Sequence, residues 1–186
     1  MDLKQILRIL ARHLRLYTRC ENGATAIEFA LVSFPFIFMI IGIIEMSLMF
    51  TAQSVLDRAT SNAARLVRTG QLQQLSGAAQ QTAFEDAVCD YAGFLMDCSQ
   101  IQYLVQDIED FAEANTFAAP EFDEDGNMVV TGFSLGGSSD VVFMRVVYRY
   151  PIVTPIMAQF LGNSEGNKRV LMSTNVLKAE PYEFGT

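Results

Sequence analysis

The sequence predicts an α+β protein in which one long N-terminal helix carries a small domain with an antiparallel sheet. Three observations predict this class. An apolar run from Phe29 to Ile44 has no charged residue, and apolar character resumes from Met46 to Ala52. Helical periodicity then continues to about residue 68. Beyond it, residues 128–135 and 141–150 have the composition of strands.

Charge divides the chain at its N-terminal end. Residues 1–23 hold five basic and two acidic side chains, whereas the rest holds 8 basic and 19 acidic ones, a net charge of −11. So acidic a surface excludes nucleic acid as a partner, because binding it requires cations that neutralise phosphates. The basic leader suits an anionic cytoplasmic membrane face. Its apolar residues recur at helical spacing, which fits either an interfacial helix or a leader that supplies only charge.

The apolar run predicts a transmembrane helix over about 29–52. As a helix this range measures about 36 Å, enough to cross a hydrocarbon core of ~30 Å. The five basic residues before it place the N-terminus in the cytoplasm and the acidic remainder outside. Pro35 removes one backbone hydrogen bond, so we expect a bend there.

The order of the N-terminal features is informative. An ordinary secretory signal has its apolar core before the cleavage site and loses it on cleavage. Here Gly23 closes the basic leader and the apolar run follows. Cleavage after Gly23 would leave Ala24 as the new N-terminus, with Glu28 fifth and Phe29 sixth, and would retain the helix.

This layout resembles a type IV prepilin leader and, more narrowly, the TadE-like proteins of tight-adherence (Tad or Flp) pilus systems. The resemblance extends from Asn22 to about Arg68 and returns more weakly at 147–151 and 173–180. Ala24 departs from type II secretion pseudopilins and type IVa pilins, which usually have phenylalanine there.

The resemblance implies a minor pilin or pseudopilin that takes part in pilus assembly and hence in adherence. A prepilin peptidase would cut between Gly23 and Ala24. The mature chain would lie in the bacterial cytoplasmic membrane, its domain outside, beside other pilins and the Tad inner-membrane platform, and could enter the pilus. Glu28, with Phe29, would set subunit register by pairing with the free amine of Ala24 in a neighbour. The alternative is an uncleaved single-pass anchor whose outer domain binds a ligand or partner.

Three further charged residues on this long helix are candidates for contacts. Glu45 would either pair with a basic residue of a partner subunit or lie at the outer interface in water. Arg65 and Arg68 continue an amphipathic extension that we expect to end at about residue 69, with Gly70 as the stop. They would be solvated, or would contact a partner or the acidic surface of the domain.

Residues 70–186 form the predicted extracytoplasmic domain. Apolar spacing predicts a second helix over 84–95, and alternation predicts a short strand over 101–105. Residues 107–115 fit a helix or a loop. The strands at 128–135 and 141–150 are separated by two glycines and two serines, as in a hairpin, and 170–177 forms the last strand.

The two cysteines that remain after cleavage lie on the side of the membrane where disulfides persist. On one continuous helix, Cys89 and Cys98 would be about 13 Å apart, too far to bond. A disulfide therefore requires the helix to end near residues 93–96. The alternative is two free buried thiols.

Catalytic patterns are missing from the sequence. The one histidine, His13, lies in the leader, so the mature chain offers no His-dependent triad or zinc site. The acidic stretch 121–127 lacks the spacing of a calcium loop, and we interpret it as a solvated turn. We expect no enzymatic activity, no cofactor and no metal.

Overall fold

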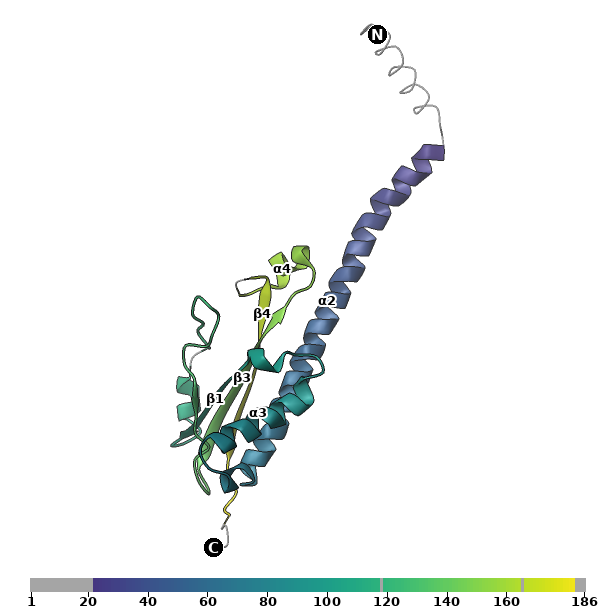
Figure 1. Ribbon diagram of the computed structural model, residues 1–186. Helices are drawn as coiled ribbons and strands as arrows, with labels where there is room; N and C mark the ends of the chain where they lie inside the picture. The colour runs from purple at the N-terminus through teal and green to yellow at the C-terminus, as the bar shows by residue number, and fades with distance from the viewer. Residues whose placement is uncertain (1–21, 118, 165, 183–186) are drawn as a thin grey trace, which may run out of the picture. The chain divides into compact units, whose positions relative to one another are not determined.

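The computed structural model describes residues 22–117, 119–164 and 166–182 (Figure 1). The chain divides into two compact units, Met1–Ile44 and Glu45–Thr186. A long helix is followed by a small domain of helices and a four-stranded sheet, so the predicted α+β class is confirmed. The leader pattern at 1–21, with His13 and Cys20, lies outside the described residues.

Helix α2 runs from Asn22 to Arg68 and continues through Pro35. It ends where Gly70 adopts a φ of 74°, a left-handed conformation that glycine accepts without strain. The backbone N–H of Gly70 donates to the Val67 carbonyl and that of Gln71 to the Leu66 carbonyl, both at 3.1 Å. These bonds satisfy carbonyls that a helix end otherwise leaves open, so the predicted stop at Gly70 is confirmed.

The part of α2 in the second unit packs through one face. Its fully buried apolar residues recur every three or four positions: Ala52, Leu56, Ala59, Ala63 and Val67. This spacing places them on one stripe, which is buried against the rest of the unit. Gln53 adds a hydrogen bond across the interface, donating to the Met172 carbonyl at 3.0 Å.

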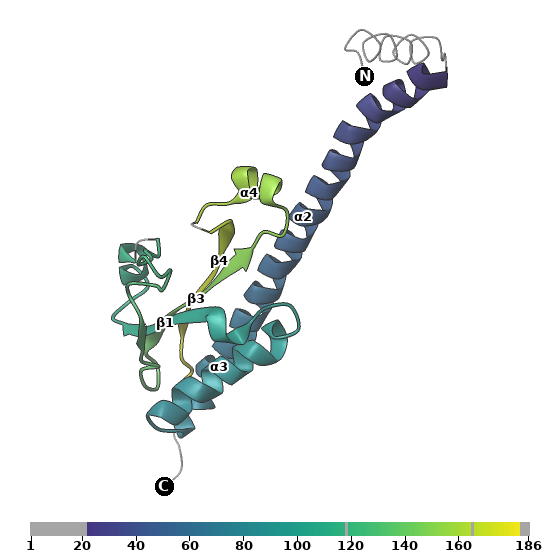
Figure 2. The same cartoon turned by 45° about the horizontal axis from the view of Figure 1, so that its top comes forward.

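Helix α3, Ala78–Ala92, lies beside this part of α2 in both views (Figures 1 and 2) and follows a short 3-10 turn, Leu72–Gln74. It includes most of the second predicted helix but starts earlier and ends sooner. Its buried Phe84 contacts the rings of Tyr103 and Phe133 edge-on, at 5.8 and 5.6 Å between centroids. These contacts fix α3 to the sheet.

The sheet has the order β2-β1-β3-β4. Strand β1 is Ile101–Ile108, β2 is Gly132–Phe133, β3 is Val141–Pro151 and β4 is Lys168–Lys178. Strand β3 is central and pairs antiparallel with both β1 and β4, through registers such as Ile101↔Tyr148 and Val141↔Lys178. The first and last predicted strands are therefore confirmed.

The predicted hairpin between 128–135 and 141–150 is wrong. Both edges of β3 are occupied, by β1 on one side and β4 on the other, so no edge remains for residues 128–135. Only Gly132 and Phe133 form a strand, and they pair in parallel with Leu104 and Val105 on the outer edge of β1. The sheet is consequently mixed, where the sequence had indicated an antiparallel one.

Both faces of the sheet are covered, which explains why β3 reads as a nearly continuous apolar run. Val142, Met144 and Val146 are fully buried on the face toward α2 and α3. On the other face Leu104, Phe143 and Val147 belong to a cluster that Phe117 and Phe122 complete, from the segment between β1 and β2. That segment contains a 3-10 turn, Glu113–Thr116, which resolves the helix-or-loop alternative for 107–115 largely in favour of a loop.

Candidate functional site

The proposed processing site lies at the N-terminal end of α2. Gly23 and Ala24 are both within the helix, which starts at Asn22. Four positions beyond Ala24, the side chain of Glu28 is exposed, and Phe29 beside it is 74% exposed. Neither residue is covered by the described chain, so this end of α2 is free to meet lipid or another subunit.

One helix of the described chain is long and apolar enough to cross a membrane, with a mean hydropathy of 2.4 in a window that is 0% buried. Its unburied part is shorter than the predicted 29–52. Met49 and Ala52 are buried within the second unit, which begins at Glu45. The segment left for a membrane is 25–44, about 30 Å at ~1.5 Å per residue, which matches the hydrocarbon thickness.

Glu45 is held inside its own domain and is 4% exposed. One carboxylate oxygen accepts the backbone N–H of Val153 at 3.0 Å, and the other accepts the hydroxyl of Thr154 at 2.9 Å. Burial and then the charge of Glu45 raise the pKa of the Tyr150 phenol. The carboxylate is therefore buried and not in water, and the two hydrogen-bond donors that it meets belong to its own chain, an arrangement that the sequence did not predict.

Thr154 is the residue before helix α4, Pro155–Leu161. Its side chain makes no capping bond to the helix and donates instead to Glu45. The bonds from Val153 and Thr154 thus attach the connection between β3 and β4 to Glu45, the first residue of the second unit. Buried carboxylates require such partners, and these two donors supply them to Glu45.

Arg65 and Arg68 are exposed near the C-terminal end of α2. They line a surface hollow of about 390 Å³ together with Phe111 and Lys178. Arg68 lies 4.0 Å from Glu180 in an exposed ion pair, and its carbonyl accepts the backbone N–H of Glu180 at 2.9 Å. Contact with the acidic surface of the domain, one of the alternatives, therefore describes Arg68.

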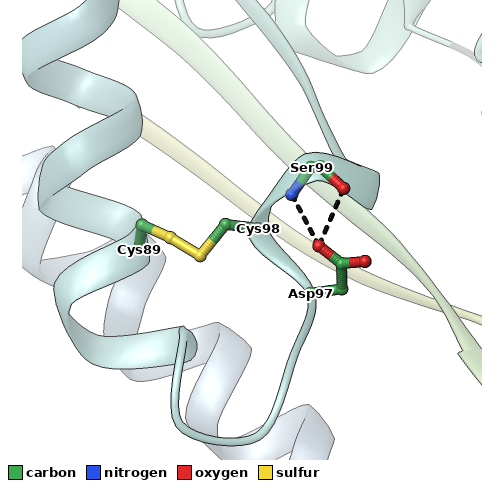
Figure 3. The surroundings of a disulfide bond; sticks show 4 residues. All are labelled: Cys89, Asp97, Cys98 and Ser99. Atoms are coloured by element: carbon green, nitrogen blue, oxygen red, sulfur yellow. Dashed lines mark hydrogen bonds between the residues drawn. A yellow bond between two sulfur atoms is a disulfide. The ribbon is translucent and has the colours of Figure 1, made fainter.

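Cys89 and Cys98 form a disulfide, with their Cα atoms 5.8 Å apart (Figure 3). Helix α3 ends at Ala92 with Gly93 as its cap, so the chain turns back as the bond requires. Asp97 shapes the return, accepting the Ser99 hydroxyl at 2.7 Å and its backbone N–H at 3.0 Å. These hydrogen bonds lower the pKa of Asp97, the side-chain bond contributing most.

The acidic stretch 121–127 forms a turn. Asp123 accepts the backbone N–H of Asn127 at 2.7 Å, and this bond is the main cause of a lowered pKa for its carboxyl group. Arg149 of β3 donates to the Asp125 carbonyl at 3.1 Å. Within 22–117, 119–164 and 166–182, no group of three or more His, Cys, Asp or Glu side chains is arranged to hold a metal ion.

Sequence reasoning missed the partners of Glu45. Thr154 followed by Pro155 is a helix-start signal, since proline favours the first helical position. No local pattern, however, connects residue 45 with residues more than a hundred positions later.

Comparison of the chain with known protein families gives a match that lies within α2. Residues 23–65 match the family model of TadE-like proteins. This segment is similar to TadE-like proteins. The matched range begins at Gly23, includes Glu28 and Glu45, and covers less than a quarter of the chain. No curated protein and no solved structure matches the chain.

The TadE-like match implicates the chain in Tad pilus assembly. Within the described residues, the apolar helix that is long enough to cross a membrane suggests a membrane anchor, and the match suggests a pilus system.

Proposed function

We propose that the protein is a minor pilin or pseudopilin of a Tad pilus system, processed after Gly23. The observation that carries the proposal is the apolar segment 25–44, which has no buried residue and lies within the TadE-like match. The segment is long enough to span the cytoplasmic membrane, and the basic leader favours a cytoplasmic N-terminus. The protein acts by assembly and has no catalytic role.

In this proposal the two glutamates of α2 have different tasks. Glu45 satisfies donors of its own domain. Glu28 is exposed within the apolar segment 25–44, near its N-terminal end, where a carboxylate is costly unless it is paired. The free amine of Ala24 in a neighbouring subunit supplies that pairing after cleavage. The prepilin peptidase, other pilins and the inner-membrane platform are accordingly the proposed partners.

A deletion strain complemented with the wild-type chain and with Glu28→Gln tests this function. We expect Glu28→Gln to accumulate normally in the membrane fraction and yet to restore few pili, because the amide loses the ionic pairing. Glu121→Gln, a matched change at an exposed glutamate of the domain, should restore pili fully. Normal piliation in the uncomplemented deletion strain would refute the proposal, and normal piliation with Glu28→Gln would refute the role of Glu28.

A further inference from the structure

Helix α4 and the residue before its cap expose large apolar side chains. Val153 is 74% exposed, Ile156 54% and Phe160 73%. Met157 and Ala158 of the same helix are buried and hold it against the domain. One side of α4 is therefore fixed by packing, while its other side presents apolar surface that no described residue covers. We call Val153, Ile156 and Phe160 the α4 patch.

The α4 patch lies at the end of the second unit where α2 enters it. The hydrogen bonds from Val153 and Thr154 to Glu45 place it beside the first residue of that unit. The opposite end of the second unit is where Arg68 meets Glu180. Strand β3 starts near that end, where Val141 pairs with Lys178, and runs toward the end that holds the α4 patch (Figure 2). By chain continuity, Glu45 directly follows the apolar segment 25–44.

Basic residues adjoin the α4 patch. The backbone of Lys168 forms an antiparallel β-bridge with that of Ser164, just after α4. The guanidinium of Arg169 donates to the carbonyl of Leu161, the last residue of α4, at 2.8 Å. Residues 151–172 carry Lys168 and Arg169 against Glu165, a net charge of +1, in a unit with a net charge of −10. Apolar side chains next to local positive charge fit the headgroup region of an anionic membrane.

We propose that the α4 patch lies in the outer interface of the membrane that residues 25–44 span, with Lys168 and Arg169 near lipid phosphates. The inference rests on the single-pass anchor of the proposed function. A segment of about 20 helical residues ends at the edge of the hydrocarbon, so Glu45 and the α4 patch attached to it lie at headgroup depth. The domain then rests on the bilayer at two points, α2 and α4.

The chain contains no tryptophan, which permits single-tryptophan reporters in the full-length protein in lipid nanodiscs. Phe160→Trp reports on the α4 patch. Phe34→Trp, at a 75% exposed position of the apolar segment, reports on the anchor. Phe111→Trp, at a 54% exposed position beside Arg68, reports on the opposite end of the domain. Quenching by lipids brominated near the headgroup or deeper in the acyl chain measures contact with the bilayer.

We expect brominated lipids to quench most of the fluorescence of Phe34→Trp and Phe160→Trp and little of that of Phe111→Trp. Quenching of Phe160→Trp should be stronger with shallow bromines, and stronger with phosphatidylglycerol than with zwitterionic lipid. If Phe160→Trp behaves like Phe111→Trp while Phe34→Trp is quenched, the α4 proposal fails and the anchor stands. If Phe34→Trp is not quenched either, both the anchor and the α4 proposal fail. The tryptophan emission of Phe160→Trp could instead shift to the blue only at high protein density, without quenching by brominated lipid. That result would assign the α4 patch to contact with a second copy of the chain and overturn the lipid proposal.

Discussion

At the residue scale, two glutamates on one helix differ in what surrounds them. Glu28 is exposed on the apolar part of α2, whereas Glu45 is 4% exposed and accepts two hydrogen bonds. Both lie within the TadE-like match, so a shared pattern of residues does not imply a shared role. Burial and hydrogen bonding assign Glu45 to the stability of the domain and leave Glu28 for contacts outside it.

Glu45→Ala should destabilise the domain. The change leaves the Val153 N–H and the Thr154 hydroxyl without their acceptor, at a cost of about 1–3 kcal/mol for each buried donor that water does not reach. Near-UV circular dichroism during thermal unfolding of the full chain in detergent measures the loss. Glu28→Ala is the matched control on the same helix and should unfold like the wild type. Equal unfolding temperatures for both variants would contradict the assignment.

Tyr103→Phe should flatten the alkaline part of the stability profile. Burial, then the charges of Glu85 and Asp86, raise the pKa of Tyr103 above its ordinary value of about 10. The folded state therefore holds the phenolic proton more tightly than the unfolded state. This stability is complete below about pH 10 and is lost as the pH rises toward the folded pKa.

The measurement is the unfolding temperature of wild type and Tyr103→Phe between pH 8 and pH 12. The wild type should lose more stability than the variant over this range, with a remaining slope from Tyr150 and Tyr182, whose pKa values burial also raises. Tyr91→Phe, at a 51% exposed position, should retain the wild-type profile. If the unfolding temperatures of wild type and Tyr103→Phe fell in parallel with pH, the raised pKa of Tyr103 would be contradicted.

At the scale of elements, local patterns predicted the helices better than the strand pairing. The spacing of Leu56, Ala59, Ala63 and Val67 predicts one face of α2, and the structure buries that face. Residues 128–135 also have a strand-like composition, but their pairing depends on which edges of the sheet are open. Strand β1 takes the edge of β3 that the hairpin would have used, and no pattern within 128–140 contains that information.

Removal of the disulfide with Cys89→Ser/Cys98→Ser should lower the free energy of unfolding by about 2.5–3 kcal/mol, because the closed loop is short. Denaturant unfolding with and without a reductant measures it. The reductant should destabilise the wild type by a similar amount and leave the double variant unchanged. A reductant effect of the same size in both proteins would show that the lost stability has another source.

Gly70→Ala should destabilise the end of α2 for two reasons. The φ of 74° costs an alanine about 1–2 kcal/mol, and its Cβ would come within 2.6 Å of the Tyr182 ring. Gly166→Ala provides the matched control, because Gly166 has a similar φ of 72° and nothing within 4 Å of an added Cβ. Gly70→Ala should therefore lower the unfolding temperature more, and equal effects would exclude a contribution from Tyr182.

At the scale of the whole molecule, the sequence predicted the order of the parts but not where the anchor meets the domain. The apolar run to Ala52 reads as a membrane segment, yet Met49 and Ala52 are buried against the domain. Apolar side chains that face lipid and those that face a protein core look alike in a sequence. The bonds of Glu45 to Val153 and Thr154, which mark the boundary, connect residues distant in the chain.

The central claim is that the apolar helix is kept as the N-terminus of a processed pilin-like subunit. Intact-mass and N-terminal analysis of the chain from its native host, beside Gly23→Ala, tests it most directly. We predict a wild-type chain that begins at Ala24, a Gly23→Ala chain that stays at full length, and a loss of pili with the variant. A wild-type chain that keeps residues 1–23 would contradict the account and leave a fixed membrane anchor with an outer binding domain.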